Sequence, residues 1–364
     1  MSRADVEIPI EKATLSLGRR SLVRERDAFD VHFFRDMRTD TTSMAIGCGD
    51  LGGEAPLLVR VHSSCVTSEC LSGRDCDCVE QLEGALDRIA REGRGLVFYL
   101  MQEGRGAGLT AKARDRMIVQ ASGNRLTTFE AYASMGLPAD PRRYDVIGPI
   151  SRLLGLRAPF VLLTNNPDKV EGVGRALEPE KLEIGRTETL SAPASAWNRD
   201  YLKAKFEAGH VLAGPTEGRG LLPPGDVRVF EPTRLPGHAE RVVTASYYLP
   251  IELPARTPED TMAGRAGASR IDWFRSSVVF DRRSERESIV LTAVGAERRG
   301  GGAMELGPAP GSGPEAEVTM RLVDRLPGTR SPARDALQRA LVAIRGRGEG
   351  SVVVHFDDRD HAER

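Results

Sequence analysis

Short apolar strands alternate with amphipathic helices through the first half of the chain, and this alternation constrains the fold more than any other feature. Strand-like runs cover residues 56–62, 95–101 and 159–164, and apolar residues recur at helical spacing over 78–91, 108–121 and 150–156. Such alternation is typical of α/β folds, whose ligand sites lie at the carboxyl ends of strands. The sequence therefore predicts an α/β region, a mixed sheet with flanking helices, with its polar motifs gathered at one sheet edge.

A stretch rich in proline and glycine, residues 214–225, is typical of a linker and predicts a domain boundary between residues 1–213 and 226–364. Beyond it we expect a smaller α+β domain in which we find no catalytic motif. Its predicted strands are residues 226–230, 241–251, 273–280, 288–294, 317–322 and 351–356, and its predicted helix is 332–345. A glycine-rich run at 300–313 predicts a mobile loop.

The charge balance excludes several classes of partner. The 51 basic residues nearly equal the 52 acidic ones, so the formal net charge is −1 and no global field attracts nucleic acid or an anionic membrane. No apolar run approaches the roughly 20 residues of a transmembrane helix, and residues 1–10 lack the apolar core of a secretory signal. We expect a cytoplasmic protein in which any phosphate binding is local.

All five cysteines lie in the first quarter of the chain, which favours a metal or reactive site over a disulfide framework in a chain without an export signal. Cys65, Cys76 and Cys78 are spaced C-x10-C-x-C. A catalytic zinc typically takes three protein ligands and leaves its fourth position to water, which then ionises near neutral pH. Two other interpretations stay open: a four-cysteine structural zinc that includes Cys70, and buried cysteines without a metal.

Three polar turns are candidates for anion binding. Residues 102–108 lie between a predicted strand and a predicted helix, where backbone N–H groups can hold an anion, and Arg105 adds a bidentate guanidinium. The turn from Thr164 to Lys169 also ends a strand, and its lysine is one of only six in the chain. A third turn places Asp140 two residues before Arg142. Each of these segments alone is equally typical of an ordinary turn.

Taken in order, these motifs resemble the GTP cyclohydrolase II family, which opens guanine nucleotides at the start of riboflavin synthesis. The resemblance covers residues 28–212 and does not extend to the C-terminal part. The matching segments are residues 60–65, 76–82, 102–105, 128–131, 140–142 and 162–169.

The resemblance implies that Cys65, Cys76 and Cys78 hold a zinc ion, which activates water for attack on C8 of the guanine ring. The ring opens to a formamide, and a second hydrolysis releases formate. The implied partner is GTP, with Mg²⁺ on the triphosphate, bound by a chain that forms a homodimer. The residues implied in nucleotide binding are Arg60, Val61, His62, Ser63, Ser64, Gln81, Glu103, Gly104, Arg105, Thr128, Thr164 and Lys169.

The family assigns Asp140 to proton acceptance and Arg142 to attack on the α-phosphorus. Because a guanidinium is protonated at any working pH, we interpret Arg142 instead as a group that stabilises charge in the transition state.

This chain departs from the family pattern at three places. Ser64 stands where the family has glutamate, and Asp75 stands where it has arginine before the C-D-C motif. In the helix after the glycine turn, either Arg116 or Met117 takes the place of the family's tyrosine. Neither side chain replaces a phenol in relaying a proton. One hypothesis is therefore ring opening without release of formate, and the alternative is that another residue substitutes and the ordinary product forms.

Two other functional classes compete with an enzyme. A non-catalytic protein that binds guanine nucleotides could use its C-terminal part as the regulatory output, although the cysteine pattern, Asp140 and Arg142 argue against it. A redox role for the cysteines is disfavoured because the chain has no C-x-x-C motif.

Overall fold

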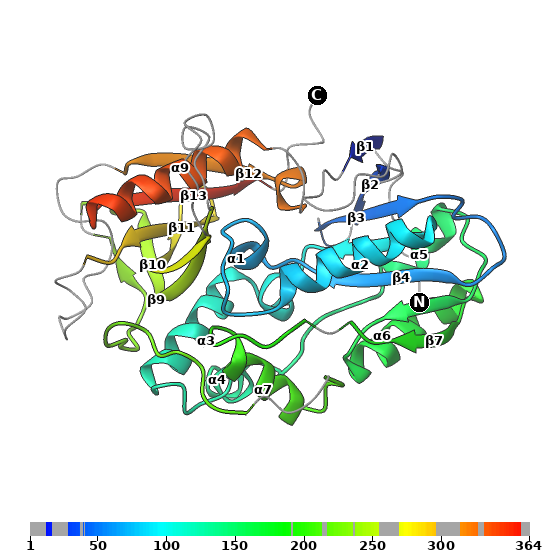
Figure 1. Ribbon diagram of the computed structural model, residues 1–364, viewed down its shortest axis with the longest axis horizontal. Coiled ribbons are helices and arrows are strands. Elements are labelled where there is room, and N and C mark those ends of the chain that lie inside the picture. The colour runs from blue at the N-terminus through cyan, green and yellow to red at the C-terminus, as the bar shows by residue number, and fades with distance from the viewer. Residues whose placement is uncertain are drawn as a thin grey trace.

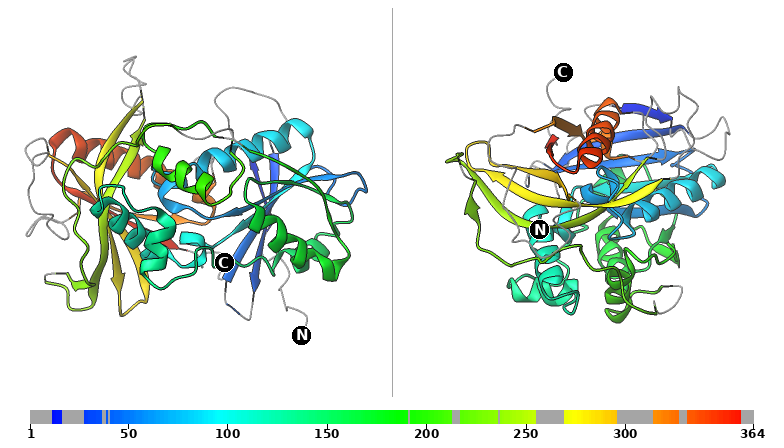
Figure 2. Two further views of the ribbon diagram at one scale, coloured as in Figure 1. Left: turned by 90° about the horizontal axis from the view of Figure 1, so that it is seen from below. Right: turned by 60° about the vertical axis from the view of Figure 1, so that its left-hand side comes forward.

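The computed structural model describes residues 12–16, 28–36, 39, 41–190, 192–212, 217–235, 237–254, 269–295, 314–326 and 331–357. Two mixed sheets with flanking helices make up these residues (Figure 1), and Figure 2 shows the sheets side by side along the molecule. The expectation of a mixed α/β architecture is thus confirmed, whereas the domain boundaries stay a prediction. The expected loop at 300–313, residues 1–10 and residues 214–216 lie outside the described residues.

The first sheet has the strand order β1-β2-β3-β5-β4-β6-β7. Strands β5, β4, β6 and β7 are mutually parallel, and β3, β2 and β1 extend the sheet in antiparallel fashion. The strands are β1 (Lys12–Ser16), β2 (Ala28–Asp36), β3 (Thr41–Cys48), β4 (Leu57–Ser63), β5 (Gly95–Leu100), β6 (Phe160–Leu163) and β7 (Ile184–Glu188). The parallel strands β5 and β6 are buried along their whole length, as expected of strands covered on both faces.

Helices cover both faces of this sheet. The apolar side of α2 (Cys78–Glu92) packs on one face, and α5 (Ile147–Leu153) and α6 (Pro167–Leu177) pack on the other. Helix α5 begins three residues before the predicted range because Pro149 fits its first turn, where no intrahelical N–H bond is needed. The remaining short elements are α1 (Val66–Glu69), η1 (Glu103–Gly106), α4 (Thr128–Ser134), η2 (Glu178–Glu180) and α7 (Arg199–Glu207).

The second sheet has the order β12-β13-β11-β10-β9-β8, in which only β12 and β13 are parallel. Its strands are β8 (Thr233–Arg234), β9 (Arg241–Leu253), β10 (Arg270–Asp281), β11 (Arg286–Ala293), β12 (Ala316–Arg321) and β13 (Ser351–Asp357), with η4 (Val323–Arg325) after β12. Helix α9 (Pro332–Arg347) packs on this sheet; the side chain of Ser331 caps its N-terminus, and Gly348 ends it with a φ of 75°.

The predicted strand at 226–230 is wrong. These residues run beside α3 (Leu109–Ala121) without joining a sheet, and Arg114 Nη1 donates to the carbonyl oxygen of Phe230 at 3.2 Å. The apolar side chains of Val227 and Phe230 instead pack against the core of the second sheet.

The core of the second sheet contains side chains from the first half of the chain. Leu109, Ala113 and Met117 of α3 are buried against β9 and β10, and so are Val66 and Leu71 around α1. Figure 1 shows α3 running beside β9. The core of the second sheet is therefore shared between the two halves of the chain, whereas the core under α5 and α6 belongs to the first half alone. None of the described helices combines the length and apolar character required to cross a bilayer.

Candidate active site

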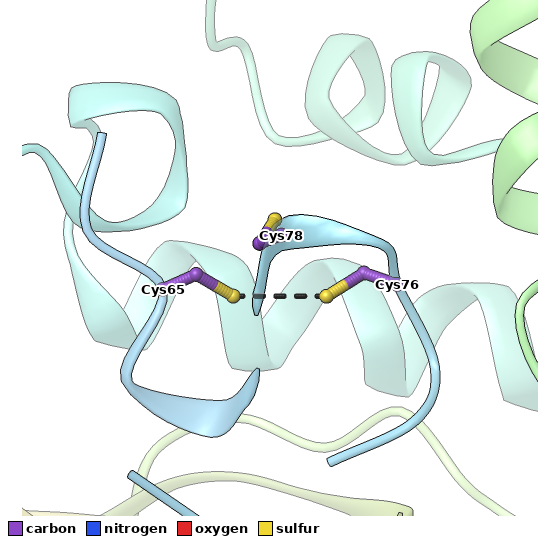
Figure 3. A group of neighbouring side chains, drawn as sticks. All are labelled: Cys65, Cys76 and Cys78. Atoms are coloured by element: carbon purple, nitrogen blue, oxygen red, sulfur yellow. Dashed lines mark hydrogen bonds between the residues drawn. The ribbon is translucent and has the colours of Figure 1, made fainter. Parts of the chain in front are cut away.

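The three cysteines of the C-x10-C-x-C pattern meet at the carboxyl end of β4. Cys65 precedes α1, and Cys76 and Cys78 lie at the start of α2. Their Sγ atoms all lie within 4.8 Å of one another, with 3.7 Å between Cys65 and Cys76; Figure 3 shows the side chains converging from two separate segments. A tetrahedral zinc with Zn–S bonds of about 2.3 Å brings its sulfurs about 3.8 Å apart. The thiol triad therefore fits a zinc ion.

Cys70 does not belong to the triad. Within the described part of the chain, the metal-binding group consists of Cys65, Cys76 and Cys78. Cys70 is buried in the apolar core of the second sheet, and this burial raises the pKa of its thiol to about 12. A zinc held by the triad would keep its fourth position for water, as catalytic zinc sites do.

Lys112 stands beside the triad. Its Nζ lies 3.0 Å from Cys65 Sγ and 2.7 Å from Glu103 Oε1, while Glu103 Oε2 accepts from the backbone N–H of Val66 at 2.7 Å. Burial alone would lower the pKa of Lys112, but Cys65 and Glu103 outweigh it and raise that pKa well above its usual value. The ammonium therefore stays charged and balances thiolate charge.

A buried chain of polar contacts connects the C-D-C turn to β4 and α7. Lys205 Nζ donates to Asp77 Oδ1 at 2.5 Å, and Gln81 Nε2 donates to Asp77 Oδ2 at 2.6 Å. Gln81 Oε1 accepts from Arg60, whose other terminal nitrogen donates to the carbonyl oxygen of Leu163 at 2.8 Å. Burial lowers the pKa of Arg60 to about 10. The guanidinium is thus held in one orientation next to Cys78.

Asp140 and Arg142 pair within one turn. Arg142 Nε donates to Asp140 Oδ1 at 2.7 Å, and Arg142 Nη2 donates to Asp140 Oδ2. Burial alone would raise the pKa of Asp140, but the hydrogen bonds and charge of Arg142 prevail and lower it. Asp140 is therefore an ionised carboxylate that orients a guanidinium, which agrees with a charge-stabilising role for Arg142.

These elements surround a pocket of about 80 Å³ that is rich in positive charge. Five cations line it, namely Arg60, Arg105, Arg142, Lys169 and Lys205, and Asp140 is its one lining carboxylate among the described residues. The buried Lys169 Nζ donates to the carbonyl oxygen of Val61 at 2.8 Å, and burial together with Arg60 and Arg142 lowers its pKa. Five cations against the two carboxylates of Asp77 and Asp140 leave an excess of positive charge, which suits an anion with several charges.

The glycine turn places Arg105 in this pocket. Gly104 and Arg105 both have a φ of 56°, in the left-handed region. A β-carbon on Gly104 would lie 3.1 Å from Lys112 Cβ, so glycine permits the close approach of the turn to α3. The guanidinium of Arg105 then lies 4.1 Å from the ring centroid of Phe129.

The structure brings most of the predicted binding residues to the pocket. Those that line it are Arg60, His62, Ser63, Gln81, Arg105, Asp140, Arg142, Thr164 and Lys169. Val61, Ser64, Glu103, Gly104 and Thr128 do not. The side chain of Val61 faces the core under α5 and α6, and Thr128 Oγ1 donates to the buried Asp115 Oδ2 at 2.8 Å. The buried hydroxyls of Ser63 and Ser64 have no hydrogen-bond partner among the described residues.

The two candidates for the family's tyrosine position separate clearly. Met117 is fully buried in the core of the second sheet, away from the triad. Arg116 Nε lies 3.0 Å from Asp75 Oδ2, next to Cys76, and the guanidinium lies 4.7 Å from the ring centroid of Tyr201. Arg116 is therefore the residue of this helix turn that faces the site.

Sequence reasoning missed several residues of the site. Tyr201, Lys205 and His210 line the pocket, and Lys112 touches the triad. A signal existed for the lysines: the chain has only six, and Lys112, Lys169 and Lys205 are all buried. The contribution of Tyr201 and His210 depends on where α7 packs, for which the local sequence has no signature.

A larger cavity of about 580 Å³ lies on the other side of the glycine turn, between the two sheets. It is lined by Glu103 and Gly106 on one side and by Phe280, Glu287 and Phe356 on the other. None of the triad cysteines lines it.

Comparisons with known proteins agree with this geometry. The sequence model of the family described as GTP cyclohydrolase II matches residues 18–185. The chain is 39% identical over 186 residues to GTP cyclohydrolase-2 of Shewanella amazonensis, which covers 51% of this chain and 87% of that protein. It is 38% identical over 194 residues to GTP cyclohydrolase-2 of Teredinibacter turnerae, covering 52% of this chain and 92% of that protein.

Proposed function

Because the chain belongs to the GTP cyclohydrolase II family, we propose that it hydrolyses GTP, opening the imidazole ring of guanine at C8 and releasing pyrophosphate. One observation carries the proposal: the thiol triad adjoins a pocket lined by five cations, and Cys78 belongs to both. The triad suits a water-activating metal, and the cations suit a triphosphate. A protein that only binds nucleotide has no use for the first of these.

Cys65, Cys76 and Cys78 would hold the metal, which we propose to be zinc. When bound, zinc supplies Lewis-acid activation of water near neutral pH. Lys112 offsets the negative charge of Cys65, and Glu103 holds Lys112 in place.

Two bonds of GTP break in the proposed reaction. Water adds across C8–N9, so that C8 becomes the formyl carbon of a formamide on N7 and N9 takes a proton. Hydrolysis at the α-phosphorus breaks its bond to the bridging oxygen, and pyrophosphate leaves. Arg142, oriented by Asp140, and the neighbouring Lys169 would stabilise the charge that develops on the phosphates. We propose that Mg²⁺ accompanies the triphosphate as its counter-ion.

We further propose that the product keeps its formyl group, as a formylamino-pyrimidinone ribonucleotide 5′-phosphate. The support is Arg116, a permanently protonated guanidinium that pairs with Asp75 and is the site-facing one of the two candidates for the position of the family's tyrosine. Tyr201 favours the other outcome, because it is a phenol in the pocket. If Tyr201 relays a proton in place of the family's tyrosine, formate is released.

The experiment incubates the purified chain with GTP and Mg²⁺ and measures pyrophosphate, formate and the mass of the nucleotide product. We expect pyrophosphate in equal amount to a formylamino product, with no formate. One formate per pyrophosphate would refute the proposed product and leave ring opening intact. Tight binding of GTP without either release would refute the enzyme and support a regulator.

Two variants test the metal site. Cys76→Ser should abolish both pyrophosphate release and ring opening, together with the bound zinc measured by elemental analysis. Cys70→Ala is the matched control, since Cys70 is a nearby buried cysteine outside the triad. This variant should retain the bound zinc and the turnover of GTP. The homodimer implied by the resemblance is also a proposal, which light scattering on the purified chain tests.

A further inference from the structure

We infer that the second sheet forms part of the metal site, because its strand β9 holds in place the segment that connects Cys65 to Cys76. This inference gives residues 226–357 a role and rests on the proposed function in one respect, the presence of a metal on the triad. The role is to fix the three thiols in their binding arrangement before the metal arrives.

The connecting segment pairs directly with β9. Gly73 forms an isolated antiparallel bridge with Ile251. Arg74 N–H donates to the carbonyl oxygen of Pro250 at 2.8 Å, and Glu252 N–H donates to the carbonyl oxygen of Ser72 at 2.9 Å. Strand β8 pairs only with Val242 and Val243 at the opposite end of β9. The connecting segment therefore pairs with the end of the β9 edge opposite to β8, at residues 250–252.

The fit at Gly73 is tight. Its N–H donates to the carbonyl oxygen of Thr67 at 2.8 Å, so the segment also folds back onto α1. A β-carbon on Gly73 would lie 2.6 Å from the Thr67 oxygen and 3.0 Å from Leu249 Cδ1. The backbone is thus held between α1 and β9 with no room for a side chain. Leu71, two residues earlier, is buried in the core of the second sheet.

Helix α3, on the other side of the triad, is attached to the same strand. Gln120 Oε1 accepts from the N–H of Tyr248 at 2.8 Å, and Gln120 Nε2 donates to the carbonyl oxygen of Tyr248 at 2.7 Å. Helix α3 carries Lys112 and Arg116, which contact Cys65 and Asp75. Strand β9 therefore fixes both the segment between the ligands and the helix that contacts them.

This arrangement has a thermodynamic consequence. A free loop between two metal ligands must lose its conformational freedom when the ion binds, and that loss weakens binding. Pairing with β9 removes the freedom in advance. The family match ends at residue 185, and the second sheet begins at Thr233, so strand β9 lies outside the family-like region although the segment and the helix that it holds lie inside it.

The test measures how fast zinc leaves the full-length, zinc-loaded chain to an excess of a chelating dye. Gly73→Ala displaces the segment from β9, and Gln120→Ala removes the two hydrogen bonds between α3 and Tyr248. We expect zinc release to accelerate about tenfold in each variant, as for other residues that orient metal ligands. The dissociation constant for a non-hydrolysable GTP analogue, measured on the zinc-loaded protein, should stay unchanged.

Two controls separate this role from general stability. Gly174→Ala adds the same methyl group in α6, where no heavy atom lies within 4 Å of the new carbon, and should release zinc at the wild-type rate. Leu177→Ala weakens the core of the first sheet, far from β9, and should lower the unfolding temperature without accelerating zinc release.

The outcomes are distinct. Zinc release at the wild-type rate from Gly73→Ala and Gln120→Ala, or equal acceleration in Leu177→Ala, overturns the inference. If Gly73→Ala does not unfold cooperatively, Gln120→Ala alone decides. A wild-type chain that binds no zinc overturns the proposed function instead.

Discussion

Arg116 and Asp75 form an ion pair beside the thiol triad, with 3.0 Å between Arg116 Nε and Asp75 Oδ2, and their side chains are only 11% and 14% exposed. The resemblance places Asp75 where the family has arginine, and Arg116 is one of the two residues that it places where the family has tyrosine. The two departures from the pattern are thus in contact. Asp75 thus pairs with a cation that helix α3 carries.

Replacing Asp75 and Arg116 with the family's arginine and tyrosine should lead to release of formate. Arg116→Tyr alone leaves Asp75 as a nearly buried charge without its partner, and we expect a loss of about 3 kcal/mol in unfolding free energy. The double variant Asp75→Arg with Arg116→Tyr should recover most of that stability and yield formate from GTP. Urea unfolding and a formate assay check both results.

An exposed pair provides the control for this exchange. Arg175→Tyr breaks the ion pair between Arg175 and Glu171, whose side chains are 68% and 69% exposed. It should change the free energy of unfolding by less than about 1 kcal/mol. If the double variant is no more stable than Arg116→Tyr, the two departures are independent of each other.

Lys169→Met should stabilise the free protein while weakening its hold on GTP. Lys169 is 4% exposed, and burial together with Arg60 and Arg142 disfavours its charge. Because burial disfavours the ammonium charge, an apolar side chain of similar length should raise the free energy of unfolding. The measurements are thermal unfolding and the KM for GTP, which should rise at least about tenfold.

Lys203→Met is the matched control, because Lys203 is 55% exposed and pairs with Glu207 on the surface of α7. It should leave both the stability and the KM unchanged. A Lys169→Met protein with an unchanged KM would remove Lys169 from the phosphate site.

His210 should make the protein lose stability in mild acid. Burial, and then the charges of Lys205 and Arg142, lower the pKa of His210 from 6.5 to about 4. Between these values the unfolded chain binds a proton that the folded chain does not, so stability falls as the pH falls through this window. The loss for this group is at most about 3 kcal/mol.

His210→Gln should remove this loss. Urea unfolding at pH 7, 6 and 5 should show a shallower decline in unfolding free energy than in the wild type. His238→Gln, a substitution at an exposed histidine, should leave the decline as it was. Equal declines in the wild type and His210→Gln would contradict the assignment.

The ring of Tyr201, rather than its hydroxyl, should stabilise the site by its contacts with Arg116 and Lys205. The guanidinium of Arg116 and the ammonium of Lys205 each lie 4.7 Å from its centroid, and their carboxylate partners, Asp75 and Asp77, flank Cys76. Tyr201→Phe keeps both cation–π contacts and should retain stability and pyrophosphate release. Tyr201→Leu removes them and should cost about 1–3 kcal/mol by thermal unfolding. A large loss of turnover in Tyr201→Phe would instead assign the hydroxyl to the reaction.

The parts of the fold that the sequence predicts well are those with a local signature. Residues 56–62, 95–101 and 159–164 are continuous apolar runs, and the observed strands β4, β5 and β6 match them within about one residue at each end. Their polar ends form the pocket, because parallel strands bring their carboxyl ends to the same sheet edge.

What the sequence could not predict depends on contacts between distant residues. Residues 226–230 have an apolar pattern that suits a strand, but they run beside α3, where only Val227 is buried and Phe230 is partly buried. The pairing of residues 72–74 with residues 250–252 joins segments far apart in the chain and has no local signature. The partner of Arg116 could not be predicted for the same reason.

The shared core under α3 has a practical consequence for anyone who dissects this protein. Truncation after residue 213 would expose to solvent the apolar side chains of Val66, Leu71, Leu109 and Met117, which are now buried. They would form a hydrophobic surface patch. Such a fragment would contain every cysteine and every cation that lines the pocket, and we still expect it to aggregate. We therefore expect the segment that resembles the relatives to need the second sheet for its solubility.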